Sequence, residues 1–224
     1  MANLLKSSSY CQHKNPKKLI IMLHGYGDHA LNFIQIASLL DKVEWKIKYI
    51  ALNAPNHIID YPMGYEWFNL YPNGVYIRNA SNDDLKIVNH DIDESINKLI
   101  ITINHHVKLL NLKISDCIIL GFSQGGMMTY ALGNYVEDKF AGLAILSGRI
   151  FSKNKITNKH LIETPIFISH GAKDDVIPIE DFNKSVNFLK ENKCNFESYK
   201  IDQDTHTISE NTINLLQKFI KKYL

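Results

Sequence analysis

Short, continuous apolar runs alternate with longer segments of helical periodicity along this 224-residue chain. Runs that are apolar throughout, without the polar alternation of a half-exposed strand, are typical of parallel strands covered by helices on both faces. The alternation therefore predicts an α/β fold with a mostly parallel, doubly wound sheet flanked by helices. The predicted strands are 18–23, 45–52, 116–120, 141–146, 165–169 and 196–201.

The segments between these strands show apolar residues at steps of three or four, as amphipathic helices do. The longest predicted helix covers 82–110, and Ser81 followed by Asp84 predicts a capping box at its start. Residues 53–80 break the pattern, because prolines and glycines interrupt any helix or central strand. This segment is predicted to be mostly loop, packed through its many aromatic residues. Other helices are expected near 30–40, 123–136, 179–191 and 208–224.

Length and composition favour one globular domain over residues 1–224, with 1–17 as an N-terminal extension. Hydrophobic residues make up 45% and charged residues 21%, which excludes a disordered chain. The formal net charge of +2 is far from the clustered basic stripe that nucleic-acid binding requires, so no nucleic-acid partner is expected.

Membrane and metal signals are also weak. The longest apolar runs, such as 19–23, are far shorter than the roughly 20 residues of a spanning helix, so no transmembrane segment is expected. The N-terminus lacks the pattern of a secretory signal, which predicts a cytoplasmic protein. The three cysteines share no ligand spacing, so neither a disulfide framework nor a metal site is expected.

A G-x-S-x-G motif, GFSQG, occupies 121–125, where a predicted strand turns into a predicted helix. A nucleophile elbow needs its serine in a strained turn, with small residues on either side so that strand and helix can approach closely. Gly121 and Gly125 meet that need, and Ser123 is the candidate nucleophile. The alternative is an ordinary glycine-rich turn without a catalytic role.

Hydrolases with such an elbow carry serine, acid and histidine in that chain order. Of the ten histidines, His206 alone follows the later strand and acid candidates, and it precedes the last predicted helix. After the strand 165–169 a glycine turn is followed by Asp174 and Asp175. The order predicts His206 as the base and either aspartate as its orienting acid. A solvated loop histidine and helix-capping carboxylates are the alternatives.

Acyl transfer also requires two backbone N–H groups as an oxyanion hole. The residue after the nucleophile supplies one, which predicts the amide of Gln124. The second comes from a loop after an early strand, and the turn HGYGD at 24–28 makes the amide of Tyr26 the candidate. His24 precedes the serine and is predicted to be structural.

Four segments together resemble the carboxylesterase/phospholipase family of α/β-hydrolases, which includes the acyl-protein thioesterases. The resemblance extends from about Leu19 to the C-terminus and includes a Trp67-Phe68 pair before the long helix. It implies an α/β-hydrolase fold without a large cap domain. The segments are LHGYGD at 23–28, GFSQGG at 121–126, LSG at 146–148 and HGAKDDVIP at 170–178.

The resemblance also assigns residues. It implies Asp174, three residues after the glycine, as the acid, and the amides of Tyr26 and Gln124 as oxyanion donors. In the family a proline usually follows the acid, whereas this chain has Asp175. Met127 stands where the family often has a small residue, which implies a different pocket volume near the elbow.

These residues predict hydrolysis of carboxylic ester or thioester bonds through an acyl-enzyme, without a cofactor. The aromatic-rich loop 53–80 is predicted to lie near the active site. Its aromatic residues from Tyr61 to Tyr76, including Trp67 and Phe68, are predicted to line an acyl groove, with core packing as the alternative, and Met127 is a further predicted contact of the acyl group. The expected substrates are small or lipid-like acyl esters and thioesters, including those of acylated proteins. A serine peptidase or a non-catalytic binding protein on the same fold are the rival interpretations.

Overall fold

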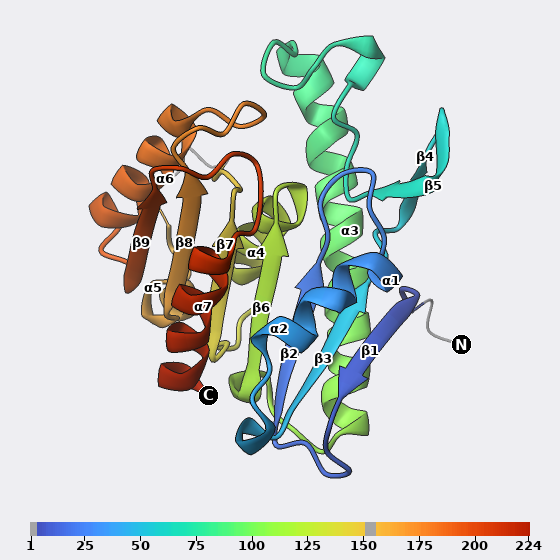
Figure 1. Cartoon of the computed structure of the whole chain (residues 1–224). Helices are drawn as coiled ribbons and strands as arrows, with labels where there is room; N and C mark the ends of the chain where they lie inside the picture. The colour runs from blue at the N-terminus through green and yellow to red at the C-terminus, as the bar shows by residue number, and fades with distance from the viewer. Residues whose placement is uncertain (1–3, 151–155) are drawn as a thin grey trace.

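The computed structural model describes residues 4–150 and 156–224, which surround one seven-stranded sheet of order β1-β3-β2-β6-β7-β8-β9 (Figure 1). All neighbouring strands are parallel except β1, which pairs antiparallel with β3. The predicted mostly parallel sheet is confirmed. Its strands are β1 Ser7–Cys11, β2 Lys18–Leu23, β3 Ile47–Leu52, β6 Cys117–Phe122, β7 Gly142–Leu146, β8 Ile166–Gly171 and β9 Phe196–Ile201.

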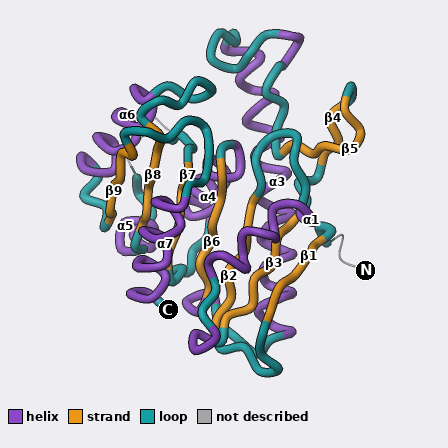
Figure 2. Tube along the Cα trace, in the orientation of Figure 1, coloured by secondary structure: helices purple, strands orange, loops and turns teal. Residues whose placement is uncertain are grey.

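Helices cover both faces of the sheet (Figures 1 and 2). One layer contains α1 and α2 with the C-terminal α7, and the other contains α3, α4, α5 and α6. Single 3₁₀ turns, η1 to η4, complete the connections. The α-helices are α1 Ala30–Phe33, α2 Ala37–Leu40, α3 Asn82–Leu109, α4 Gln124–Tyr135, α5 Lys159–Glu163, α6 Ile179–Glu191 and α7 Glu210–Tyr223, and the 3₁₀ turns are Ile34–Ile36, Val43–Trp45, Pro72–Gly74 and Ile114–Asp116.

The continuous apolarity of the strands has the predicted cause. Along β2, Ile20 and Met22 belong to the core beneath α1, α2 and α7, whereas Leu19, Ile21 and Leu23 belong to the core beneath α3, α4 and α6. All five side chains are fully buried. A strand with a core on each face has no side for polar residues, so its sequence reads as one apolar run.

Two features at the start of helices follow from local sequence. The predicted capping box is present: the Ser81 hydroxyl accepts a hydrogen bond from the Asp84 amide, and the Asp84 carboxylate accepts one from the Ser81 amide. Between the predicted ends of the segment 30–40, two short helices joined by a 3₁₀ turn replace a single continuous helix. None of the helices in the described part of the chain is both long and apolar enough to cross a membrane.

The N-terminal extension predicted over 1–17 is corrected in part, because β1 lies within it and forms an edge of the sheet. Its sequence, SSSYC, is mostly polar, and its residues alternate between exposed and half-buried. An edge strand covered on one side only needs little apolarity, so its sequence gives no strand signal. Residues 1–3 of the extension lie outside the described residues.

Most of the segment 53–80 is loop, as predicted, but the segment also contains regular structure that its sequence did not predict. It contains an antiparallel hairpin of β4 Asn56–Ile58 and β5 Tyr61–Glu66, which projects from the body of the molecule (Figures 1 and 2). Pro62 is tolerated there because the two-stranded hairpin leaves each strand with a free edge. The hairpin tip exposes Ile59 and Met63 to solvent, and the chain then enters the core at Trp67.

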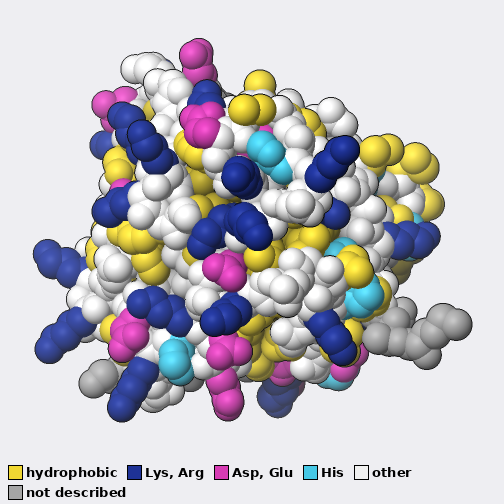
Figure 3. All heavy atoms as spheres, turned by 90° about the horizontal axis from the view of Figure 1, so that it is seen from below, with side chains coloured by type: hydrophobic (Ala, Val, Ile, Leu, Met, Phe, Trp, Pro, Cys, Tyr) yellow, Lys and Arg dark blue, Asp and Glu magenta, His cyan; other side chains and the backbone are white. Residues whose placement is uncertain are grey.

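Parallel strands place all of their carboxyl ends on one edge of the sheet, where binding sites of open α/β sheets lie. The opposite edge is seen from below in Figure 3, where lysine and arginine side chains gather. A hollow of about 610 Å³ is lined there by Lys14, Lys17 and Lys46, among others. The sequence places none of its candidate catalytic residues at this basic edge.

Candidate active site

The GFSQG motif forms a strained turn between β6 and α4. Ser123 has φ 54° and ψ −117°, outside the regions that side-chain-bearing residues usually adopt. A Cβ atom on Gly121 would lie 2.1 Å from the carbonyl oxygen of Gly125, and one on Gly125 would lie 2.0 Å from that of Leu23. Neither position can hold a side chain, so the two glycines let β6, β2 and α4 converge beneath the serine.

Three loops at the carboxyl edge bring the predicted residues together. Nε2 of His206, in the loop after β9, lies 2.9 Å from Oγ of Ser123. Nδ1 of the same ring lies 2.7 Å from Oδ2 of Asp174, in the loop after β8. The side chain of Asp174 is fully buried and that of His206 is 15% exposed, so one ring edge stays open to the cleft.

The loop after β8, which carries Asp174, packs closely against the loop after β9, which carries His206. A Cβ atom on Gly171 would lie 2.3 Å from the carbonyl oxygen of Asp204 and 2.4 Å from that of Thr205. The amide of Lys173 donates to the same Asp204 carbonyl at 2.9 Å. The glycine therefore permits the close approach that sets His206 against Asp174.

Of the two neighbouring carboxylates, Asp174 contacts the histidine and Asp175 is exposed. The second carboxylate oxygen of Asp174 accepts hydrogen bonds from the amides of Val176 and Ile177, at 2.9 and 2.7 Å. Burial acts to raise the pKa of Asp174, but the hydrogen bonds from His206 and these two amides hold it below the usual range. The carboxylate is therefore ionised and can stabilise a charged imidazole.

Two backbone amides converge near Ser123. A Cβ atom on Gly25 would lie 3.3 Å from Cβ of Ser123, so the loop that carries Tyr26 packs directly against the serine. Gln124 is the first residue of α4, where helical N–H groups have no intrahelical acceptor. Among the described residues no acceptor pairs with the amide of Tyr26 or of Gln124. Both N–H groups are thus available to a ligand.

His24 supports the loop that carries Tyr26. It is fully buried; its Nδ1 lies 2.7 Å from the Gly25 carbonyl oxygen, and its Nε2 accepts a hydrogen bond from the amide of Ala54. Burial lowers its pKa. These contacts agree with the structural role predicted for His24.

Trp67 and Phe68 require a correction, because both side chains have no exposed surface. The indole N–H of Trp67 donates to the carbonyl of His24, and the side-chain amide of Gln124 bonds to the backbone of both aromatic residues, at 3.0 and 2.7 Å. The prediction that this pair contacts an acyl group is wrong, because its hydrogen bonds and burial place it in the core behind the elbow. The core-packing alternative holds for both residues.

The cleft above Ser123 has a volume of about 380 Å³ and a largely apolar wall. Met127 is one of the residues that line it, and its contact with an acyl group stays a prediction. The tyrosine rings of the wall contact one another, with centroids of Tyr26 and Tyr71 6.3 Å apart and those of Tyr71 and Tyr76 5.5 Å apart. The lining residues are Tyr26, Leu70, Tyr71, Tyr76, Ser123, Gln124, Met127, Val176, Ile177 and His206.

An ion-pair network fastens the segment after Tyr76 to the start of α6. Nη2 of Arg78 lies 2.6 Å from Oδ2 of Asp181 in the first turn of α6, and Nη1 of Arg149 lies 3.3 Å from the same oxygen. Asp181 is buried, so both guanidinium groups compensate for its desolvation. The bridge stabilises the wall of the cleft that carries Tyr71 and Tyr76.

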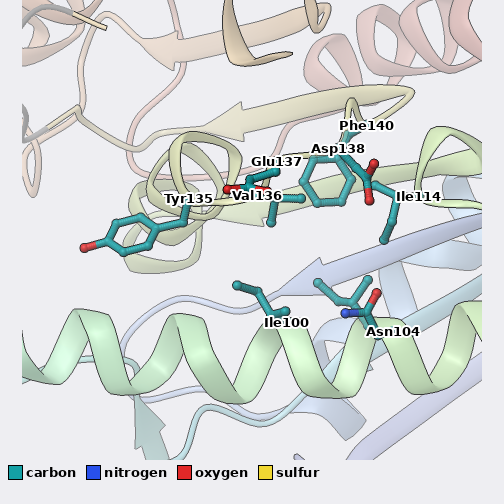
Figure 4. A pocket seen from close by; sticks show the side chains of 9 residues that line it. Ile100, Asn104, Ile114, Tyr135, Val136, Glu137, Asp138 and Phe140 are labelled. Carbon is teal, nitrogen blue, oxygen red and sulfur yellow. The ribbon is translucent and has the colours of Figure 1, made fainter. Parts of the chain in front are cut away.

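A second hollow, of about 250 Å³, lies between α3 and the turn after α4 (Figure 4). Ile100 and Asn104 project into it from α3, facing Val136 and Phe140. Its lining contains no candidate catalytic residue. In the part of the chain that the structure describes, no group of three histidines, cysteines or carboxylates is placed to hold a metal ion.

One titratable side chain near the cleft gives a test of stability. Glu66, at the end of β5, has a pKa raised to about 7 by burial and by the negative charge of Asp91. The unfolded chain releases this proton near 4.5, so folding stability falls as pH rises between about 4.5 and 7.

We therefore expect Glu66→Gln, which keeps the shape without the charge, to raise the melting temperature at pH 8 and to raise it much less at pH 5. Thermal unfolding at the two pH values measures this difference. Asp60→Asn, at an exposed position of the same hairpin, is the control and should show no such pH dependence. Equal gains at both pH values would show that Glu66 titrates normally.

Comparison with known proteins identifies the family of this chain. A sequence model of the phospholipase/carboxylesterase family matches residues 7–224. The chain belongs to this family. An acyl-protein thioesterase 1 from Debaryomyces hansenii is 31% identical over 94% of the chain and 93% of its own length. Acyl-protein thioesterase 1 homolog 1 from Dictyostelium discoideum is 26% identical over 100% of the chain and 99% of its own length.

Solved structures of the same fold extend the family comparison. Esterase PE8 superimposes with a TM-score of 0.83 at 21% identity, covering 99% of the chain and 100% of the esterase. SOBER1 from Arabidopsis thaliana gives a TM-score of 0.76 at 22% identity, covering 92% of the chain and 99% of SOBER1. The predicted family and its α/β-hydrolase fold without a large cap domain are both confirmed.

Proposed function

We propose that the protein is a serine hydrolase that cleaves carboxylic ester or thioester bonds through an acyl-enzyme on Ser123. The proposal rests chiefly on one observation, the chain of hydrogen-bond contacts from Ser123 through His206 to the buried Asp174, at 2.9 and 2.7 Å. A serine, a histidine and an ionised carboxylate in this order form a nucleophile, its base and the group that orients the base. Membership of the phospholipase/carboxylesterase family supports the same chemistry.

In the first half-reaction Oγ of Ser123 attacks the carbonyl carbon of the substrate, and Nε2 of His206 takes the serine proton. The Asp174 carboxylate can only accept, so it places the hydrogen of the neutral ring on Nδ1 and leaves Nε2 free as the base. The amides of Tyr26 and Gln124 donate to the oxyanion of the tetrahedral intermediate. Such a donor contributes about 2.7–4 kcal/mol to lowering the barrier.

The intermediate collapses when His206 returns the proton to the departing thiol or alcohol, which leaves the acyl group on Ser123. Water then attacks the acyl-enzyme with His206 again as base, and the same two amides stabilise the second oxyanion. His206 returns the proton to Oγ of Ser123 as the ester bond breaks, which releases the carboxylic acid and restores the free serine. Every proton and charge of the cycle is carried by these residues. The mechanism therefore needs no cofactor.

The substrate class follows from the cleft. Its apolar and aromatic wall suits an acyl chain, while the open side leaves room for a leaving group of variable size. The thioesterase relatives favour a thioester, including one on an acylated protein. We propose lipid-like acyl esters and thioesters as substrates.

Labelling and substrate profiling test the proposal together. A fluorophosphonate probe should modify Ser123 alone, as read by mass spectrometry of the labelled peptide. Acyl thioesters and p-nitrophenyl esters should be hydrolysed, and peptide p-nitroanilides should not. Labelling elsewhere, or cleavage of the anilides alone, would refute an esterase or thioesterase with this nucleophile.

Chain-length dependence tests the role of the tyrosine wall. Each methylene buried in the cleft contributes up to about 0.8 kcal/mol, or about fourfold in kcat/KM, so kcat/KM should rise with acyl length and then level off. Tyr76→Ala should flatten that rise while acetyl esters are hydrolysed nearly as before. Tyr135→Ala, which removes an exposed tyrosine from the remote hollow, is the matched control. An equal loss for short and long acyl groups would show that Tyr76 does not contact the chain.

A further inference from the structure

A second histidine, His170, touches the acid of the proposed triad. It occupies the carboxyl end of β8, and both its side chain and that of Asp174 are fully buried. Its Nε2 lies 2.7 Å from the carbonyl oxygen of Ile177 and 3.3 Å from Oδ2 of Asp174. The mechanism described above uses none of its atoms.

The partners of His170 fix the tautomer of its ring. The Ile177 carbonyl can only accept, so the hydrogen of His170 is on Nε2. The same Nε2 lies 3.3 Å from Oδ2 of Asp174, as a contact rather than a hydrogen bond, and that oxygen accepts the Nδ1–H of His206 at 2.7 Å. One carboxylate oxygen thus lies between two imidazole rings.

His170 and two backbone amides contact the Asp174 carboxylate on different sides. The other oxygen of Asp174 is held by the amides of Val176 and Ile177, and the carbonyl of Ile177 is held by His170. The carboxylate and the loop that follows it are therefore tied to the end of β8 at two points. Rotation of the carboxylate away from His206 would break these bonds.

Packing alone does not account for a histidine at this position. The ring lies against Phe182 of α6, with centroids 5.6 Å apart, and that neighbour is uncharged. Nδ1 of His170 is buried and has no hydrogen-bond partner among the described residues. A buried nitrogen without a partner opposes folding, so an apolar ring would suit the packing better. What a histidine adds at this position is its Nε2–H, which donates to the carbonyl of Ile177.

We propose that His170 is a positioning residue, which holds the Asp174 carboxylate in the orientation that aims Nε2 of His206 at Ser123. The inference rests on the proposed function. His170 thereby acts on the geometry of the base, through the acid and the loop that holds it, without touching substrate.

The decisive variant is His170→Phe, which keeps a ring against Phe182 and removes the N–H. We expect kcat to fall about 10- to 100-fold, the usual cost of losing a group that orients a reactive one, with KM changed less than about twofold. The acid limb of the kcat/KM profile should move to lower pH, because a carboxylate that has turned away from His206 favours the charged form of that histidine less strongly.

Two further variants separate positioning from simple packing. His170→Gln can place an amide N–H where Nε2 lies, so it should restore kcat and the pH profile. Phe182→Leu alters the surface under the ring but not the N–H, and it should leave the pH profile unchanged. If His170→Phe is too unstable to assay, His170→Asn, whose shorter amide does not reach Asp174, should show the same shifted profile.

An activity-independent readout keeps this inference separate from the proposed function. The downfield ¹H NMR signal of the His206 Nδ1–H bonded to Asp174 should shift or broaden in His170→Phe and return in His170→Gln. An unchanged signal and an unchanged pH profile would overturn the positioning role even if Ser123 proves essential. If the unmodified protein showed no hydrolysis that depends on Ser123, the proposed function would be refuted instead.

Discussion

Ser123→Ala is expected to lower kcat by a factor on the order of 10⁶, because the nucleophile and the acyl-enzyme are both lost. The fold should persist, since alanine can occupy the same backbone conformation and, among the described residues, the serine hydroxyl is hydrogen-bonded only to His206. Steady-state kinetics with a thioester substrate and thermal unfolding measure the two effects. An unchanged melting temperature shows that the loss is chemical.

A matched control for this variant is Ser147→Ala. Ser147 also has a positive φ, 46°, and follows β7 at the same edge of the sheet. Ser147 is buried and is not part of the hydrogen-bond chain from Ser123 through His206 to Asp174, so its alanine variant should keep nearly normal turnover. If Ser123→Ala retained more than about a tenth of the activity, Ser123 would not be the nucleophile.

Asp174→Asn is expected to lower kcat by about 10⁴-fold, as in other triads, and the structure explains how. The amides of Val176 and Ile177 both donate to one side of the side chain, so asparagine would place its oxygen there and its NH₂ toward His206. An NH₂ donor facing Nδ1 forces the ring hydrogen onto Nε2, which then cannot take the proton of Ser123.

Asp175→Asn is the control, because it changes the same charge one residue away at an exposed position. Its turnover should stay within a few-fold of normal. The pH profile of kcat/KM for both variants checks whether only Asp174 is coupled to the base. A larger loss in Asp175→Asn than in Asp174→Asn would transfer the acid to Asp175 and contradict the contact seen here.

Local sequence predicted the framework well where the signal was local. The strands β2, β6, β7 and β8 are buried on both faces, so their continuous apolar runs identify them without tertiary information. The capping box of α3 depends on residues three apart and was equally predictable. The motif GFSQG specified a backbone conformation, because only glycine fits at positions 121 and 125.

The elements that sequence missed depend on distant partners. β1 is a polar strand whose only reason to be extended is the edge of β3, which lies some 40 residues further along the chain. The aromatic residues of the segment 53–80 look alike in sequence, yet Trp67 enters the core while Tyr71 and Tyr76 line the cleft. The Gln124 side chain holds the backbone of Trp67 in the core. The ion pair of Arg78 with Asp181 holds the segment that follows Tyr76.

The sequence by itself determined the parallel sheet, the elbow with Ser123 and the chain order of the candidate triad, since each follows from periodicity or from glycines that no other residue can replace. The residue pattern alone left Asp174 and Asp175 open, and the family resemblance favoured Asp174. Only the tertiary structure shows its contact with His206 and puts His170 beside it. The physical reason is that adjacent residues in a turn point in different directions, and a hydrogen bond between loops depends on how several strand ends come together in space. Such distances are properties of packing, which no local pattern records.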